Sequence, residues 1–105
     1  MREIHQLVHT LSYGDAISSE VVTLKNVFTE LGNRSEIYSI NTHPKYKGLT
    51  KHYTEFPREF TGEVVLHYSL GSELNELYRS LNKAKRTLIY HHLTPASWFK
   101  YVNAR

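Results

Sequence analysis

The stretch that decides the fold is residues 4–40, IHQLVHTLSYGDAISSEVVTLKNVFTELGNRSEIYSI. Its first part, Ile4–Thr10, is a short apolar run that predicts a buried strand. The next apolar residues recur at helical spacing and predict one stripe on a helix: Ile17, Val21, Leu24, Phe28 and Leu31. Arg34–Ile40 favours a second strand. This strand–helix–strand order predicts two parallel strands with a right-handed crossover.

Turn and cap residues mark both ends of the predicted helix. Tyr13, Gly14 and Asp15 stand directly before it; glycine tolerates a positive φ, and aspartate is a favoured N-cap. Gly32 stands where a left-handed C-terminal cap is preferred. We therefore expect a helix of about four turns that ends at Gly32.

Strands and helices continue to alternate downstream. Val64–Tyr68 predicts a third strand and Thr87–His91 a fourth. Ser72 can cap a helix between them, whose apolar positions are Leu74, Leu77, Tyr78 and Leu81. We expect an α/β domain with at least four parallel strands, in the order 3-2-1-4 when these four strands are numbered along the chain.

Two further segments complete the chain. Asn41–Gly62 is polar and rich in helix breakers, so we expect short helical turns or a mobile loop there. Thr94 and Pro95 have the residue types of a helix start, with Thr94 as the N-cap.

Composition narrows the function classes. With 105 residues, 40% hydrophobic and 22% charged, the chain suits one globular domain. The absence of cysteine excludes disulfides, thiol catalysis and zinc fingers. No apolar stretch approaches the roughly 18 residues of a membrane span, and the N-terminus does not resemble a secretory signal. We therefore expect a cytoplasmic protein.

The charge balance argues against nucleic-acid binding. The net charge is only +3, and there is no concentrated basic run. A small basic cluster, Lys83, Lys85 and Arg86, follows the second predicted helix, where positive charge complements the helix dipole. We interpret it as a solvated helix end.

Three loops follow the carboxyl ends of predicted parallel strands, and each has a histidine at or near its start: His9, His67 and His91. Ligands of open parallel sheets bind at this edge, so the three imidazoles could bind metal, act in acid–base chemistry or hydrogen-bond to the backbone. We expect no metal, because no metal-ligand motif such as His-Glu-x-x-His is present. We also expect no cofactor: the Gly14 turn has one glycine where a dinucleotide fingerprint needs three, and there is no P-loop.

Four pieces in order resemble the family 4 glycosyltransferases. The first two are His5-Gln6 with Gly14-Asp15-Ala16-Ile17-Ser18, and Ser35-Glu36-Ile37-Tyr38 after the helix. The other two are residues 66–72, LHYSLGS, and residues 90–95, YHHLTP, which are similar to the HYS-x-GS and YHN-x-TP stretches of bacterial members. The resemblance runs from about residue 4 to residue 102.

The resemblance implies a retaining enzyme built from two Rossmann-like domains that face each other across a cleft. This chain would be one N-terminal, acceptor-side domain or fragment, and a C-terminal partner domain with a Glu-x7-Glu pattern would hold the nucleotide-sugar donor. The loop of Tyr13, Gly14 and Asp15 would lie near the donor phosphates and the acceptor. His91 would contact the reacting sugar, with His9, His67 and His92 at the cleft rim; His92 stands where the family usually has asparagine, so either His91 or His92 could point inward.

Two other functions remain open from the sequence. One is a stand-alone Rossmann-like binding or scaffold module that pairs with a separate chain. The other is a response-regulator-like domain, which would need acidic residues where these strand ends have histidines. Because an incomplete sheet leaves an edge and the aromatic residues Trp98, Phe99 and Tyr101 uncovered, we also expect a homo-oligomer, with the protein in the cytoplasm or at the inner face of the membrane.

Overall fold

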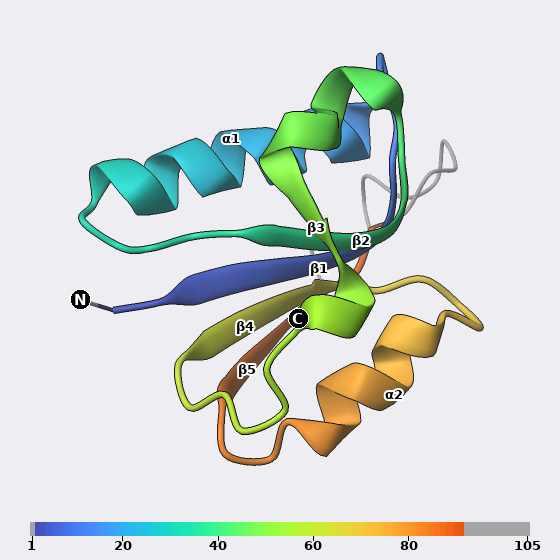
Figure 1. The fold of residues 1–105 in the computed structure, drawn as a ribbon. Helices are drawn as coiled ribbons and strands as arrows, with labels where there is room; N and C mark the ends of the chain where they lie inside the picture. Colours follow the sequence, from blue (N-terminus) through green and yellow to red (C-terminus); the bar gives the residue numbers. More distant parts are fainter. Residues whose placement is uncertain (1, 92–105) are drawn as a thin grey trace, which may run out of the picture.

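The computed structural model describes residues 2–91, which form an α/β fold around one sheet of five parallel strands (Figure 1). The predicted fold class is confirmed, and the arrangement is Rossmann-like, with helices on both faces of the sheet. The strands of this part of the chain are β1 (Ile4–Leu11), β2 (Ile37–Thr42), β3 (Thr50–His52), β4 (Glu63–His67) and β5 (Lys85–Ile89).

Two α-helices cover opposite faces of the sheet: α1 (Ala16–Glu30) and α2 (Glu73–Ser80) (Figure 1). Neighbouring residues of β1 contribute to both apolar faces of the sheet, because successive side chains of a strand point to opposite sides. Leu7 packs in the cluster that includes Leu74 and Leu77 of α2, whereas Val8 packs in the cluster that includes Val21 of α1. The core therefore has two halves, one on each side of β1.

The strand order differs from the predicted one. The sheet order is β3-β2-β1-β4-β5, so the Val64–Tyr68 strand (β4) lies beside β1 and not beside β2. The place beside β2 belongs to β3, a strand of three residues that gave no sequence signal. β5 pairs with β4 and not with β1. Apolar runs predict that strands exist, but they contain no information about which strands pair, and this explains the error.

The observed order has a functional consequence. Within the sheet, β2 and β3 lie on one side of β1. The chain then returns past β1, and β4 and β5 lie on its other side. The order therefore reverses between β1 and β4, and the carboxyl ends at such a switch point are where open α/β sheets bind ligands.

Helix ends follow the sequence closely. Asp15 caps α1, since its carboxylate accepts from the N–H of Ile17 at 2.9 Å. Gly32 has φ +94°, as expected for a left-handed helix terminus. The predicted apolar stripe is less well covered than expected, because Leu31 lies beyond the helix and is 73% exposed.

The ends of α2 also behave as the sequence predicts. The Ser72 hydroxyl accepts from the N–H of Leu74 at 3.1 Å. At the other end Arg86 donates to the carbonyls of Tyr78 and Arg79, both at 3.2 Å. The basic cluster thus supports the end of a helix.

The polar stretch between β2 and β4 forms short helical turns, one of the two expected outcomes. They are the 3₁₀ helices η1 (Pro44–Leu49) and η2 (Tyr53–Glu55), on either side of β3. Within residues 2–91 no helix has the length and apolar character needed to cross a membrane. The helix predicted at Thr94 and Pro95, and the aromatic residues from Trp98 onward, lie outside the described residues.

Candidate functional site at the carboxyl edge of the sheet

A cavity of about 230 Å³ opens at the switch point between β1 and β4. It brings together four of the predicted site residues, which come from the ends of three strands and the cap of α1: His9, His67, His91 and Asp15. The remaining lining residues are Val8, Thr10, Ile17, Tyr68 and Ser69. The structure therefore places these residues of separate loops at one edge of the sheet.

A chain of hydrogen bonds runs through the wall of the cavity on the side of α1. Gln6, in the middle of β1, donates from its amide nitrogen to the carbonyl of Val21 in α1 at 2.9 Å. Its Oε1 is hydrogen-bonded to Nε2 of His67 at 2.7 Å. Nδ1 of His67 is in turn hydrogen-bonded to Nε2 of His91 at 2.9 Å. Nδ1 of His91 lies 3.6 Å from the carboxylate of Glu20.

The two imidazoles of this chain meet edge to edge. Their planes differ by 13°, and a centroid distance of 5.2 Å with ring nitrogens 2.9 Å apart requires the rings to lie end to end and not one above the other. His67 is almost fully buried. Burial lowers the pKa of His67 to about 4, with a further lowering from the nearby His91. His67 is therefore neutral near pH 7, and His91, at the cavity surface, is the member of the pair that a ligand can reach.

His9 lies on the opposite face of β1 and has a different partner. Its Nδ1 is hydrogen-bonded to the hydroxyl of Ser72 at 2.8 Å. Because that hydroxyl also accepts from the first turn of α2, His9 connects the cavity wall to the start of the second helix. Its side chain is consequently held in one position at the rim.

The predicted phosphate loop is only partly in the cavity. Gly14 has φ +83° and makes the tight turn that was expected of it. Asp15 lines the cavity, but its carboxylate already occupies the amino end of α1, which adds a negative charge where a phosphate would bind. Tyr13 points elsewhere: it is exposed, and the Nζ of Lys45 lies 4.3 Å from its ring centroid.

Several expectations concern residues or groups that the cavity does not include. His92 lies outside the described residues. The structure therefore places His91 at the cavity but does not compare the two histidines. Within residues 2–91, no group of three or more histidine, aspartate or glutamate side chains is placed to hold a metal ion.

Two residues of the site were missed in the sequence. Gln6 is a buried polar residue within an apolar strand, and that contrast is the signal that could have identified it. Glu20 lies on α1 among other polar residues, and no pattern distinguishes it. Only the packing of α1 against the sheet places its carboxylate beside His91.

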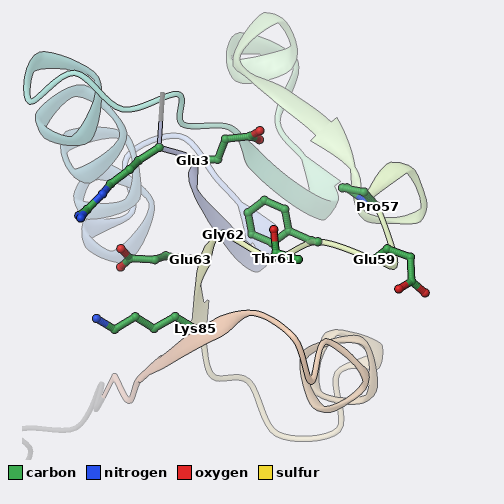
Figure 2. A pocket seen from close by; sticks show the side chains of 9 residues that line it. Glu3, Pro57, Glu59, Thr61, Gly62, Glu63 and Lys85 are labelled. Atoms are coloured by element: carbon green, nitrogen blue, oxygen red, sulfur yellow. The ribbon is translucent and has the colours of Figure 1, made fainter.

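A larger cavity, of about 720 Å³, lies at the opposite edge of the sheet, where the strands begin (Figure 2). In Figure 2 the side chains of Glu63 and Lys85 lie on the same side of the hollow, while Glu3 and Glu59 point elsewhere. Charges of both signs therefore surround it without converging on one point. We favour the smaller cavity as the functional site because it lies at the switch point and contains buried, hydrogen-bonded polar groups.

Comparisons with protein-family models, with curated proteins and with solved structures found no match. The fold and the site thus define the chain as a Rossmann-like α/β domain with a histidine-lined cavity at the carboxyl edge of its sheet. Its function is inferred from the chemistry of that cavity.

Proposed function

We propose that this chain forms the acceptor-side wall of a retaining glycosyltransferase, which moves a sugar from a nucleotide-sugar donor to an acceptor. The observation that carries the proposal is the cavity between β1 and β4, with His9, His67, His91 and Asp15 in its wall. It lies at the edge where the family resemblance expects the reaction cleft. The reaction would take place in the cytoplasm or at the inner face of the membrane.

The polar groups of the cavity suit a sugar. Sugar hydroxyls both donate and accept hydrogen bonds, and the wall offers imidazole nitrogens, a carboxylate and the Ser69 hydroxyl. Tyr68 adds an aromatic ring, which stacks with Tyr90 at a centroid distance of 5.0 Å. Such a mixture of polar groups and an aromatic surface favours a small, hydroxyl-rich ligand over an apolar one.

The size of the cavity suits one sugar ring. Sites for larger ligands measure about 300–1,000 Å³, whereas this cavity has about 230 Å³. A whole nucleotide sugar would not fit within it. This agrees with a division of labour in which a C-terminal partner domain holds the nucleotide and this domain holds the sugar or acceptor.

In the proposed reaction His91 has the central role. Its imidazole would hydrogen-bond to a hydroxyl of the reacting sugar and help to stabilise the charge of an oxocarbenium-like transition state. His67 would hold His91 through their hydrogen bond, and His9 and Asp15 would contact the sugar at the rim. The Gly14 turn would allow close approach of the ligand to the backbone.

A second candidate is a stand-alone Rossmann-like binding module without catalysis. The exposure of the edge strand β5 favours it, because an edge with a half-exposed side chain such as Leu88 offers a surface for a separate partner chain. The two candidates differ in one property. Addition of the donor-binding domain should start sugar transfer only in the first.

Saturation-transfer NMR on the 105-residue chain tests the proposal. The probes are free glucose, galactose, mannose and N-acetylglucosamine, with uridine diphosphate as a nucleotide-only probe and cyclohexanol as a ring with one hydroxyl. We expect saturation of at least one sugar and none of cyclohexanol. His91→Ala should weaken sugar binding about tenfold, the size of one hydrogen bond to a ligand.

The matched control is His52→Ala, which removes an exposed histidine on β3, away from the cavity. It should leave sugar binding unchanged. Equal saturation of every probe, or equal losses in both variants, would contradict the proposal.

A further inference from the structure

Gln6 has a defined orientation, and the proton order of its neighbours follows from it. A backbone carbonyl can only accept a hydrogen bond, so the group of Gln6 that faces the Val21 carbonyl at 2.9 Å is the NH₂ group. The amide oxygen must then face His67. Since that oxygen can only accept, Nε2 of His67 carries the proton of their 2.7 Å hydrogen bond.

The proton on Nε2 determines what the other nitrogen of His67 does. A neutral imidazole has one N–H and one acceptor nitrogen, and burial keeps His67 neutral by lowering its pKa. Nδ1 of His67 is therefore an acceptor. Nε2 of His91, 2.9 Å away, must donate to it.

His91 is thereby left with one available nitrogen of known character. With the proton of neutral His91 on Nε2, its Nδ1 has the free lone pair of a residue that lines the cavity. Nδ1 lies 3.6 Å from the carboxylate of Glu20. A carboxylate cannot donate, so within the described residues this contact gives a neutral Nδ1 no hydrogen bond, and a ligand hydroxyl or a water molecule can supply one.

We propose that Gln6 is a positioning residue which, through His67, holds the acceptor nitrogen Nδ1 of His91 toward the cavity, where it accepts a hydrogen bond from a ligand hydroxyl. This inference deepens the proposed function, and its sugar ligand rests on that function. The proton order itself rests on the hydrogen bonds from Val21 to His91 and on the neutral state of the buried His67. It assigns a donor hydroxyl, and not an acceptor such as a carbonyl, to the position next to His91.

Protonation would reverse this selectivity. The groups that face His91 are His67 from β4, Glu20 from α1, and the lining residues Asp15 and His9. A proton added to His91 must go to Nδ1, because Nε2 already has one. The resulting N–H would donate to Glu20, and the site would lose its acceptor for a ligand hydroxyl.

The imidazole nitrogen resonances of the ¹⁵N-labelled chain test the proton order directly, since protonated and unprotonated ring nitrogens have distinct shifts. We expect His67 and His91 both to have a proton on Nε2 and, in alkaline solution where imidazoles are neutral, none on Nδ1. His5 is the internal reference: its Nδ1 accepts from the N–H of Glu36 at 3.0 Å, so it should show the same tautomer from unrelated contacts. A proton on Nδ1 of neutral His91 in the unmodified chain would overturn the inference.

Gln6→Leu tests the positioning role. Leucine removes the acceptor of the His67 Nε2–H, and a buried N–H without a partner is costly, so the proton of His67 should move to Nδ1 and donate to Nε2 of His91. His91 should consequently move its proton to Nδ1, His5 should not change, and the affinity for the bound sugar should fall about tenfold. An unchanged His91 tautomer in the folded variant would overturn the role of Gln6.

The outcomes separate this inference from the proposed function. If the tautomers are as expected and no sugar binds the unmodified chain, the sugar ligand and the proposed function are both wrong, and the proton order stands. If a sugar binds while His91 has its proton on Nδ1, the inference is wrong and the proposed function stands. Should Gln6→Leu fail to fold, the spectrum of the unmodified chain still decides the proton order.

Discussion

Two buried histidines, His5 and His67, make the stability of the domain depend on pH. Burial is the main cause of the lowered pKa in both, and the contact with Glu3 opposes it in His5. His5 packs against Tyr38, Phe56 and Phe60, and His67 is almost fully buried in the wall of the cavity. His5 and His67 are therefore buried histidines, whereas His91 lies at the surface of the cavity.

We expect the free energy of unfolding to fall as the pH is lowered from about 6.5 toward 4. Because the pKa of His67 is about 4 in the folded chain and has its ordinary value of 6.5 in the unfolded chain, the unfolded chain binds the proton more tightly in this window. Between pH 7 and pH 5 the loss from His67 is about 2 kcal/mol. Urea unfolding at the two pH values measures it.

His67→Gln removes the titrating group and should reduce this pH dependence, while His52→Gln, at an exposed position, should retain it. If the free energy of unfolding changes equally with pH in the unmodified chain, His67→Gln and His52→Gln, the stability is not linked to the buried imidazole of His67.

At the scale of single residues, the sequence predicted part of the candidate site. Carboxyl ends of parallel strands share one edge, so the meeting of His9, His67 and His91 followed from element order alone. The roles of Gln6 and Glu20 could not be predicted, because they depend on the side-chain contacts between α1 and the sheet. Those contacts form only once the strands have paired.

At the scale of elements, Gly62 shows how closely the strand starts approach one another. A Cβ there would lie 2.6 Å from Cζ of Phe60 and 2.8 Å from the carbonyl oxygen of Glu3. The carbonyl of Gly62 also accepts from the N–H of Lys85 at 2.9 Å, so the position connects β4 to β5. The carbonyl of Glu3 and the N–H of Lys85 cannot move without disturbing the sheet.

Gly62→Ala is expected to lower the free energy of unfolding by about 1–3 kcal/mol, the usual cost of added volume in a close-packed place. Chemical denaturation measures the change. Gly48→Ala is the matched control, since a Cβ at that glycine meets nothing within 4 Å and its φ is not positive. Equal stabilities of the two variants would contradict the close contact of Gly62 with Phe60 and Glu3.

The sequence was most informative about single elements and least informative about their neighbours. The cap at Asp15, the left-handed Gly32 and the strand at Val64 were all predicted, because each depends on local residue types. The order of strands was wrong because a three-residue strand, β3, took the position assigned to β4. Pairing depends on long-range packing that a single apolar run does not encode.

At the scale of the whole molecule, we expect no sugar transfer by this chain alone. Transfer requires two substrates to be positioned against each other, and the proposed donor side belongs to another domain. Incubation of the purified chain with nucleotide sugars and acceptor sugars, followed by product analysis, measures this. Sustained transfer that disappears in His91→Ala would show that the chain contains a complete active site.

We also expect the chain to associate at high concentration through the edge of β5. In the described part of the chain this strand pairs only with β4, and Leu88 is 50% exposed. Light scattering over a dilution series should give a mass above 12.3 kDa at the concentrated end. Leu88→Lys should lower that mass, whereas Leu70→Lys, at an 87% exposed leucine away from β5, should not. A mass of 12.3 kDa at every concentration would exclude the association.

An amide chemical-shift map of sugar binding tests the central claim most directly, because the two cavities lie at opposite edges of the sheet. The titration uses the ¹⁵N-labelled chain and the sugar with the strongest saturation transfer. We predict that the shifted amides gather at the carboxyl edge, around His9, His67 and His91. Shifts confined to the amino edge, around Gly62 and Lys85, or no shifts at all, would contradict a sugar site between β1 and β4.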